Sequence, residues 1–318
     1  MKPWRLSAGT AGVLGIKRAK NGALPTTAYV MLGENCRNNC RFCAQASGSA
    51  AKDGFLSRVT WPAVPGEAAA ADICRAYGQG LVKRVCLQAV DCDGSWEETQ
   101  AALLALRAGA VSRVCVSSRF QTVREAEMLL AAGAEKICLA MDAATPEVYR
   151  QVKGGDWQSR FQLLAACARA FPGRVATHLI IGLGETETEA IDFIASCRDL
   201  GVTVGLFAFT PVRGTALAAM APPLLAAYRR VQIAHYLLNG GYGRPIIRCA
   251  DGRISGIALP GWEALLAEGK AFETSGCPDC NRPYYNERPG GVMYNYPQPL
   301  TRREAEQAIA DSGIGGGL

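Results

Sequence analysis

The sequence has few of the features that mark membrane, secreted or nucleic-acid-binding proteins. No stretch approaches the roughly 20 apolar residues that a membrane helix needs, and the first residues lack the apolar core of a signal peptide. No dense block of Lys and Arg occurs, although the formal net charge is +6. We therefore expect a cytoplasmic protein that binds neither membranes nor nucleic acids.

Histidine is scarce, whereas cysteine is abundant. The chain has two histidines and 13 cysteines in 318 residues. A disulfide framework is typical of a short secreted chain with an even cysteine count, so the odd count in a long chain favours reduced thiols. Cys86, Cys115 and Cys138 lie within apolar runs, and we expect them to be small packing residues at inward-facing strand positions.

Strand-like apolar runs alternate with Ala-rich helical segments along most of the chain. The expected strands are Ala28–Leu32, Val82–Ala89, Arg113–Ser117, Lys136–Met141, Arg174–Ile181, Val202–Phe209 and Pro245–Cys249, with an eighth around Ala271–Ser275. Thr122, Thr186 and Thr301 each stand three residues before a Glu, the pattern of a helix capping box. This alternation predicts an α/β fold with a parallel sheet.

A TIM-type (β/α)8 barrel is our first expectation for this sheet, and a partial (β/α)6 barrel is the second. We expect an N-terminal extension over residues 1–27 and the barrel over residues 28–255. Residues 256–318 form a C-terminal segment that ends in a Gly-rich tail, which we expect to be flexible.

Three cysteines near the N-terminus form the most informative motif. Cys36, Cys40 and Cys43 have a C-x3-C-x2-C spacing, with the aromatic Phe42 before the last thiol. Three thiolates on one loop can hold three corners of a four-iron cluster, and an open position on the fourth iron is typical of a catalytic metal site. The loop follows the first expected strand, at the strand end where barrels place their chemistry.

This spacing resembles the signature of the radical S-adenosylmethionine (SAM) superfamily, and the chain is similar to its biotin synthase and lipoyl synthase branch. The resemblance implies that SAM binds the open iron of a [4Fe-4S] cluster. An electron from a ferredoxin or flavodoxin then cleaves SAM to a 5′-deoxyadenosyl radical.

Further motifs carry the same resemblance and imply the residues that bind SAM. Met141-Asp142 followed by Thr145-Pro146 resembles a turn whose Asp binds ribose hydroxyls, and Trp157-Gln-Ser-Arg160 resembles a segment whose Arg pairs with the SAM carboxylate. The resemblance implies five cofactor-binding positions besides these cysteines and Phe42, namely Asp142, Arg160, Gly182, Gly184 and Val212. Alternatively, Asp142 caps a helix and Arg160 is a solvated helix residue.

A second cysteine motif follows the expected barrel. Cys277 and Cys280 form a C-x2-C knuckle that aims two thiolates at one metal site, and Cys249, at the end of the expected seventh strand, is a candidate third ligand. We expect an auxiliary iron–sulfur cluster here, with a zinc knuckle or a redox dithiol as alternatives. A cluster of the biotin synthase type is not expected, because Ala176 stands where that family has a cysteine.

The stretch Cys277-Pro-Asp-Cys280-Asn-Arg-Pro resembles the C-terminal stretch of two-component lipoyl synthases. The resemblance implies sulfur insertion at C6 or C8 of an octanoyl chain on a carrier protein, either a glycine-cleavage H protein or an E2 lipoyl domain. It also implies a second radical SAM subunit for the other insertion. Aromatic and arginine residues near the C-terminus form either a docking patch for the carrier or a cover for the barrel end: Arg282, Tyr284, Tyr285, Arg288, Tyr294 and Tyr296.

Two other functions remain open from the sequence. One is a biotin-synthase-like or carbon-skeleton radical SAM enzyme that acts on a small substrate, including methylornithine-forming and hydrogenase-maturation relatives. The other is a non-catalytic iron–sulfur or zinc carrier.

Overall fold

The protein is described by a computed structural model, which covers residues 1–18, 22–51, 54–287 and 290–315. The expected docking residue Arg288 and the last three residues of the Gly-rich tail lie outside these ranges. Within the described residues, no helix has both the length and the apolar character needed to cross a membrane.

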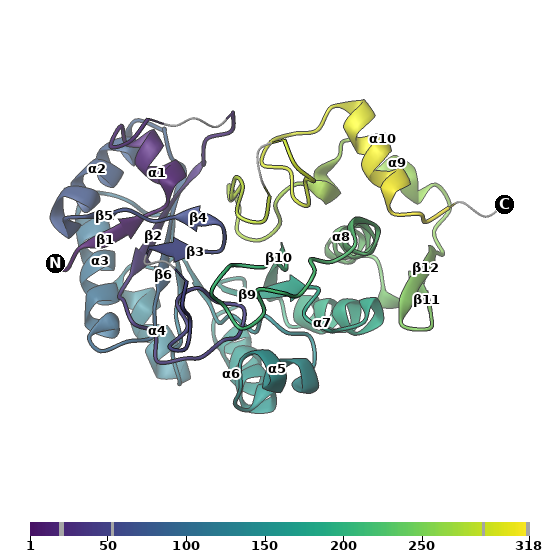
Figure 1. Ribbon diagram of the computed structural model, residues 1–318, viewed down its shortest axis with the longest axis horizontal. Helices are drawn as coiled ribbons and strands as arrows, with labels where there is room; N and C mark the ends of the chain where they lie inside the picture. The colour runs from purple at the N-terminus through teal and green to yellow at the C-terminus, as the bar shows by residue number, and fades with distance from the viewer. Residues whose placement is uncertain (19–21, 52–53, 288–289, 316–318) are drawn as a thin grey trace.

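The core of the fold is a sheet with the strand order β10-β9-β8-β7-β6-β2-β1-β5 (Figure 1). Its parallel part consists of β2 (Thr27–Leu32), β6 (Arg84–Ala89), β7 (Val114–Ser117), β8 (Lys136–Cys138), β9 (Val175–Ile181) and β10 (Thr203–Ala208). The short strands β1 (Trp4–Leu6) and β5 (Ala63–Val64) extend one edge in antiparallel fashion. All six residues of β2 are buried, as expected for a strand covered on both faces.

Helices connect and cover the parallel strands. They are α1 (Ala8–Val13), α2 (Gly66–Gly78), α3 (Ser95–Ala108), α4 (Val123–Ala132), α5 (Pro146–Val152), α6 (Trp157–Ala170), α7 (Glu187–Asp199) and α8 (Leu225–Asn239). Thr186 completes a capping box at the start of α7, and Thr122 caps α4 through the Glu125 backbone N–H. A small hairpin, β3 (Phe55–Leu56) with β4 (Val59–Thr60), follows the cysteine loop.

The fold confirms the α/β barrel in its partial form, with six parallel strands rather than eight. The segment expected as the seventh strand starts as a 3-10 turn, η1 (Arg244–Ile246), and continues as β11 (Ile247–Ala250), which pairs with β12 (Arg253–Ile257) in a separate hairpin. Asp251 and Gly252 both have positive φ angles, 49° and 77°. An Asp-Gly turn of this kind reverses the chain directly, so no helix returns it to the barrel.

The expected eighth strand is also absent from the sheet. Residues Lys270–Phe272 form the 3-10 turn η2, and Glu273 makes only an isolated bridge with Tyr296. The short helix α9 (Trp262–Leu265) precedes this turn, and α10 (Arg302–Asp311), with a complete capping box at Thr301, is the last helix of the described residues.

Residues 275–287, here called the closing segment, take the place of the missing strands between β10 and β2. The Ser275 hydroxyl accepts a hydrogen bond from Leu206 N–H of β10 at 2.9 Å, and Arg282 N–H donates to the Tyr29 hydroxyl of β2 at 2.8 Å. Further along, Asn286 Nδ2 donates to the Ala208 carbonyl at 2.7 Å. The segment therefore spans the lateral opening that a six-stranded barrel leaves, as the path of the C-terminal part in Figure 1 shows.

Candidate functional site

The N-terminal cysteine loop lies at the C-terminal end of β2, as its position in the sequence predicts. Cys36, Cys40 and Cys43 line one cavity of about 240 Å³, here called the loop cavity. Two side-chain sulfurs accept N–H bonds, Cys36 from Asn38 Nδ2 at 3.6 Å and Cys43 from the Gln45 backbone at 3.4 Å. Such N–H···S bonds are the contacts that orient and tune thiolate ligands of iron–sulfur clusters.

Two of these thiols are partly buried. Burial raises the pKa of Cys40 and raises that of Cys43 to about 12. A thiol in this environment is stable as a thiolate when a metal takes the place of its proton. The donor set and its surroundings therefore fit a cluster held by Cys36, Cys40 and Cys43.

Asp142 and Arg160, the two polar residues expected to bind SAM, line the same loop cavity. Asp142 has a φ of 63°, and its backbone bridges to β9 by accepting from Ile180 N–H and donating to the His178 carbonyl. The helix-cap alternative does not apply, because Thr145 caps α5 through the Val148 N–H.

Lys153 also lines the loop cavity, although the sequence does not indicate it. Its ammonium donates to Asp142 Oδ2 and to the Ala140 carbonyl, each at 2.6 Å, and its side chain is only 12% exposed. No local motif marks Lys153, because its partner precedes it by eleven residues across a loop and a helix.

Arg160 lies on α6 and reaches the segment that follows β7. Its guanidinium donates to the Phe120 carbonyl at 3.0 Å and to Gln121 Oε1 at 2.9 Å. Burial lowers the pKa of Arg160, so the side chain is not the solvated helix residue of the alternative interpretation. Its position on the loop cavity suits recognition of a carboxylate.

The two glycines expected to bind the cofactor lie in the turn that follows β9. Gly182 and Gly184 have φ angles of 99° and 127°, and neither belongs to the residues that line the two cavities described here. The Glu185 carboxylate accepts from the Gly182 and Leu183 N–H groups at 2.6 and 3.1 Å, which fixes the turn. A Cβ on Gly182 would lie 2.9 Å from Pro223, so the position is closed to other residues.

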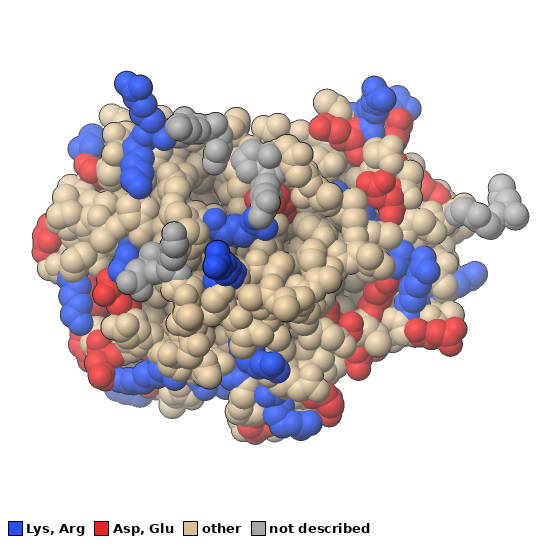
Figure 2. All heavy atoms as spheres, in the orientation of Figure 1, with Lys and Arg blue, Asp and Glu red and all other residues tan. Residues whose placement is uncertain are grey.

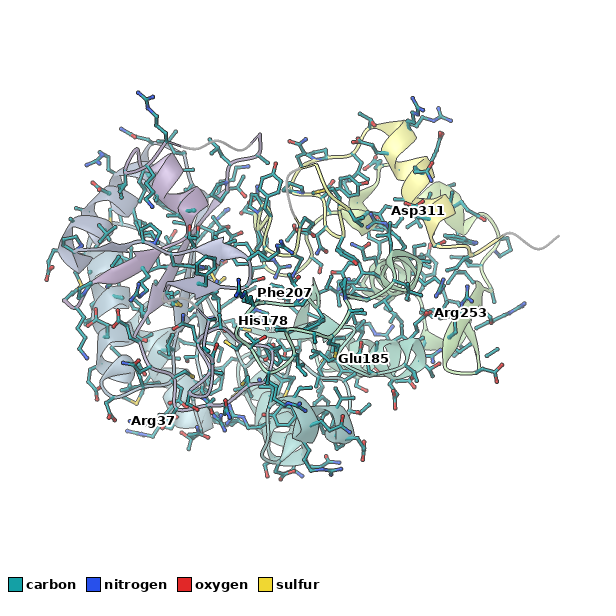
Figure 3. All side chains as sticks on the ribbon, in the orientation of Figure 1. Arg37, His178, Glu185, Phe207, Arg253 and Asp311 are labelled. Atoms are coloured by element: carbon teal, nitrogen blue, oxygen red, sulfur yellow. The ribbon has the colours of Figure 1, made fainter. Side chains whose placement is uncertain are left out.

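A second cavity, here called the lumen cavity, continues from the loop cavity into the barrel. Its volume is about 200 Å³, and both cavities share Cys43, Asp142 and His178. His178 and Phe207 both line it and contact each other with ring centroids 5.0 Å apart (Figure 3). Burial lowers the pKa of His178 to about 4, so the ring is neutral at pH 7. Phe42 and Val212, both expected to contact the cofactor, lie on its wall.

Cys86, Cys115 and Cys138 face this lumen cavity rather than only packing into the core. The expectation that they point inward is confirmed. Cys115 and Cys138 are buried, and Cys86 packs against a core cluster, but all three also border cavity space. The sequence could not reveal this, since an apolar strand run is the same whether its inner face meets side chains or a cavity.

Cys277 and Cys280 enter the same lumen cavity from the closing segment. The Cys280 sulfur lies 3.3 Å from the Tyr29 hydroxyl. A hydrogen bond from the Cys115 thiol and the positive charge of Arg84 lower the pKa of Cys277, against the opposing effect of burial. Five cysteine thiols besides Cys43 thus line the lumen cavity.

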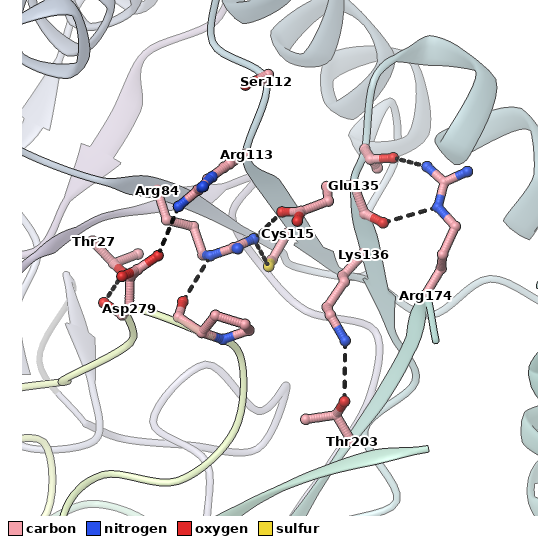
Figure 4. A network of polar contacts seen from close by, with 12 residues as sticks. Thr27, Arg84, Ser112, Arg113, Cys115, Glu135, Lys136, Arg174, Thr203 and Asp279 are labelled. Carbon is pink, nitrogen blue, oxygen red and sulfur yellow. Dashed lines mark hydrogen bonds and ion pairs between the residues drawn. The ribbon is translucent and has the colours of Figure 1, made fainter. Parts of the chain in front are cut away.

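Basic side chains surround these thiols. Arg84 donates to Cys115 Sγ at 3.1 Å, to the Pro278 carbonyl at 2.8 Å and to the Glu135 carboxylate, and Asp279 contacts Thr27 and Arg113 nearby (Figure 4). The Arg282 guanidinium lies 3.9 Å from the Phe207 ring centroid. Figure 2 shows that this face of the molecule is hollowed at its middle, with basic side chains in the hollow.

Cys249, the candidate third ligand of the auxiliary site, is not brought to this cavity. It lies on β11 in the separate hairpin, and its nearest polar contact is Arg244 Nη2 at 3.7 Å. The hairpin turn at Asp251 and Gly252 explains this placement, because it removes the strand that would have carried Cys249 to the barrel.

The residues expected to form a docking patch mostly cover the barrel. Tyr285 and Tyr294 are buried, and Tyr285 packs against Tyr29 and Trp61. Arg282 points into the lumen cavity rather than to the surface. These placements favour the cover over the docking patch.

Neither thiol group converges as the ligands of a single metal ion do. Over the described ranges of the chain, no three His, Cys, Asp or Glu side chains are placed to hold one ion. In a four-iron cluster each thiolate binds a different iron, so its ligands stand further apart than those of one zinc ion.

Comparison with known proteins agrees with this geometry. Residues 30–197, more than half of the chain, match the family model of the radical SAM superfamily. None of the curated proteins matches the chain significantly.

Solved structures share the fold at low sequence identity. HydG, a maturase of the [FeFe]-hydrogenase, aligns with a TM-score of 0.55 and 14% identity over 68% of this chain and 50% of its own. HydG from Carboxydothermus hydrogenoformans aligns with a TM-score of 0.52 and 17% identity over 68% of this chain and 52% of its own. Methylornithine synthase (PylB) aligns with a TM-score of 0.50 and 15% identity over 67% of this chain and 62% of its own.

The chain thus spans about half the length of the HydG structures, and these likenesses concern the fold alone. The superfamily uses a [4Fe-4S] cluster and SAM, for which the cysteine loop and its cavity supply the expected ligands. On the family match and this site, the chain belongs to the radical SAM superfamily of enzymes.

Proposed function

We propose that this protein is a radical SAM sulfurtransferase that inserts sulfur at C6 or C8 of an octanoyl chain carried on a protein, as in lipoyl cofactor biosynthesis. One observation carries the proposal. Cys277 and Cys280 reach the lumen of the same barrel whose other end holds Cys36, Cys40 and Cys43. Two iron–sulfur sites that face one substrate space are what sulfur insertion requires.

The chemistry explains why two sites are needed. The C–H bonds of an octanoyl chain are unactivated, and no side-chain base can remove their protons. When bound, the first cluster with SAM supplies a radical that removes a hydrogen atom, and the auxiliary cluster supplies the sulfur. The protein has to align the three groups and exclude water between them.

This chain's own residues support those tasks. Asp142 with Lys153 presents a carboxylate for ribose hydroxyls, and Arg160 presents a guanidinium for the SAM carboxylate. The wall between the two thiol groups is largely apolar, with Phe42, Leu56, Ile180, Phe207 and Val212 among its residues. An aliphatic chain that lies along this wall removes apolar surface from water.

The proposal includes partners. The octanoyl chain is carried by a small domain, an H protein or an E2 lipoyl domain, and a ferredoxin or flavodoxin donates the electron. A second radical SAM subunit performs the other insertion.

An anaerobic assay with an octanoylated carrier peptide tests the function. The expected product is heavier by one sulfur, and 5′-deoxyadenosine forms with it. In the double variant C277A/C280A, 5′-deoxyadenosine should still form but sulfur should not be added. The variant C249A serves as control, because Cys249 lies outside the lumen cavity.

A carbon-skeleton radical SAM reaction on a small substrate is the second candidate. The fold likeness to HydG and to methylornithine synthase supports it. Production of 5′-deoxyadenosine without sulfur transfer from the wild-type protein would favour this candidate, and absence of both products would favour the non-catalytic carrier.

A further inference from the structure

The lumen holds more thiols than the C-x2-C motif supplies. Cys86 of β6 and Cys115 of β7 are partners in the parallel register, so they stand side by side at the distance of neighbouring strands, about 4.8 Å. Cys138 of β8 is the register partner of Ser117, which lies two residues beyond Cys115 along β7. Cys138 therefore faces the lumen one step nearer the cysteine loop.

The closing segment is docked tightly enough to place its two thiols against these strands. The Asp279 carbonyl accepts from the Thr26 and Thr27 hydroxyls at 2.6 and 3.0 Å, and the Pro278 carbonyl accepts from Arg84. Opposite, a Cβ on Gly276 would lie 3.4 Å from the Gly205 Cα of β10. Two glycines thus allow the backbone of the C-x2-C loop to approach β10 closely.

The charge around the thiols favours an anionic ligand. The Arg282 guanidinium donates to the Leu206 and Ser275 carbonyls at 3.2 and 2.7 Å, and in the described part of the chain it forms no ion pair. A buried cation without a carboxylate partner is costly unless an anion lies beside it. The Cys280 thiol makes the largest charge interaction with Arg282, and Cys277 also contributes.

We infer that Cys86, Cys115, Cys277 and Cys280 are the four protein ligands of the second iron–sulfur cluster, which joins the closing segment to the floor of the barrel. Cys138 faces the substrate side of this cluster without ligating it. Arg84 and Arg282 offset the negative charge of the thiolates and sulfides. This ligand set rests on the second cluster of the proposed function and replaces Cys249 with two strand cysteines.

Iron content tests the ligand set without any activity measurement. All variants are made in the full chain with Cys36, Cys40 and Cys43 replaced by Ala, and are reconstituted anaerobically with Fe²⁺ and sulfide. The background protein should hold about four irons per chain with the spectrum of a [4Fe-4S] cluster. C86A/C115A and C277A/C280A should each lose this iron, whereas C138A should keep it.

The double variant C167A/C197A is the matched control, because Cys167 and Cys197 are buried thiols on helices away from the lumen. It should keep the iron, and circular dichroism checks that each variant is folded. Retention of about four irons by C86A/C115A would overturn the ligand set. Loss of iron in C138A would overturn the assignment of Cys86 or Cys115.

Hydrogen exchange of residues 275–287 provides a second measurement on the unaltered protein. Removal of iron by a chelator should speed the exchange of this segment, because the cluster ties it to β6 and β7. An unchanged rate of hydrogen exchange would contradict the inference that the cluster joins this segment to the barrel strands. Neither result depends on the octanoyl assay, so failure of the ligand set and failure of the proposed sulfur transfer can be told apart.

Discussion

The two thiol groups of this barrel differ in how the sequence encodes them. Cys36, Cys40 and Cys43 lie within eight consecutive residues on one loop, whereas the five other thiols that line the lumen cavity come from β6, β7, β8 and the closing segment. The first group is a local motif that a spacing rule identifies. The second exists only because strand register and the docking of residues 275–287 bring distant residues together.

The largest effect that this comparison predicts is that the two thiol groups can be inactivated with different consequences. C40A should abolish 5′-deoxyadenosine formation and sulfur insertion together, whereas C277A/C280A should abolish sulfur insertion alone. The measurement is anaerobic product analysis of both variants by mass spectrometry. Loss of 5′-deoxyadenosine in C277A/C280A, with folding intact, would remove the separation between the two groups.

The buried ion pair at the loop cavity gives the next largest effect. In K153M the Asp142 carboxylate, 12% exposed, loses its partner in a buried site, which should lower the free energy of unfolding by about 3–5 kcal/mol. Chemical denaturation of the apoprotein measures this change. R302M, which removes an exposed pair with Glu306, should cost less than about 0.5 kcal/mol. An equal cost for both variants would contradict the buried role of Lys153.

His178, which lies where the two cavities meet, predicts a dependence of stability on pH. Burial lowers its folded pKa to about 4 from an ordinary value of 6.5, so the unfolded chain binds more protons between these values. Stability should therefore be fully present above pH 6.5 and fall as the pH drops toward 4. His235 shares this shift, also through burial. H178F should reduce the slope measured by denaturation at pH 4.5 and 7, and an unchanged slope would contradict the burial of His178.

The docking of the closing segment gives the smallest of these effects. Gly276 has a φ of 119°. A Cβ added to it would lie 3.4 Å from the Gly205 Cα. G276A should therefore cost about 1–2 kcal/mol and speed hydrogen exchange in residues 275–287. G256A is the control, since an added Cβ there meets open space at an ordinary φ. Similar behaviour of the two variants would weaken the role of the close approach.

The same contrast explains what the sequence could and could not predict. Six strands of the parallel sheet were recognised because buried parallel strands are nearly continuous apolar runs, and Thr186 and Thr301 marked their helices through capping boxes. The prediction that a seventh and an eighth strand belong to this sheet is wrong. The Asp251-Gly252 turn, a hairpin signal, was outweighed by the expected βα alternation.

The candidate site divides in the same way. Asp142 and Arg160, which line the loop cavity, could be predicted because each belongs to a local sequence motif that follows the cysteine loop at an expected interval. Lys153, Arg84 and the lumen positions of Cys86, Cys115 and Cys138 were missed, because their partners are defined by tertiary contacts rather than by spacing. The expectation that Cys249 is a ligand depends on a seventh barrel strand, whereas the strand that carries Cys249 pairs in a separate hairpin.

Iron stoichiometry combined with spectroscopy in the presence of SAM tests the central claim most directly. The account predicts about eight irons per reconstituted chain, of which only half change their spectrum when SAM is added. About four irons per chain, all responding to SAM, would show that the barrel holds one cluster and would contradict the two-ended arrangement.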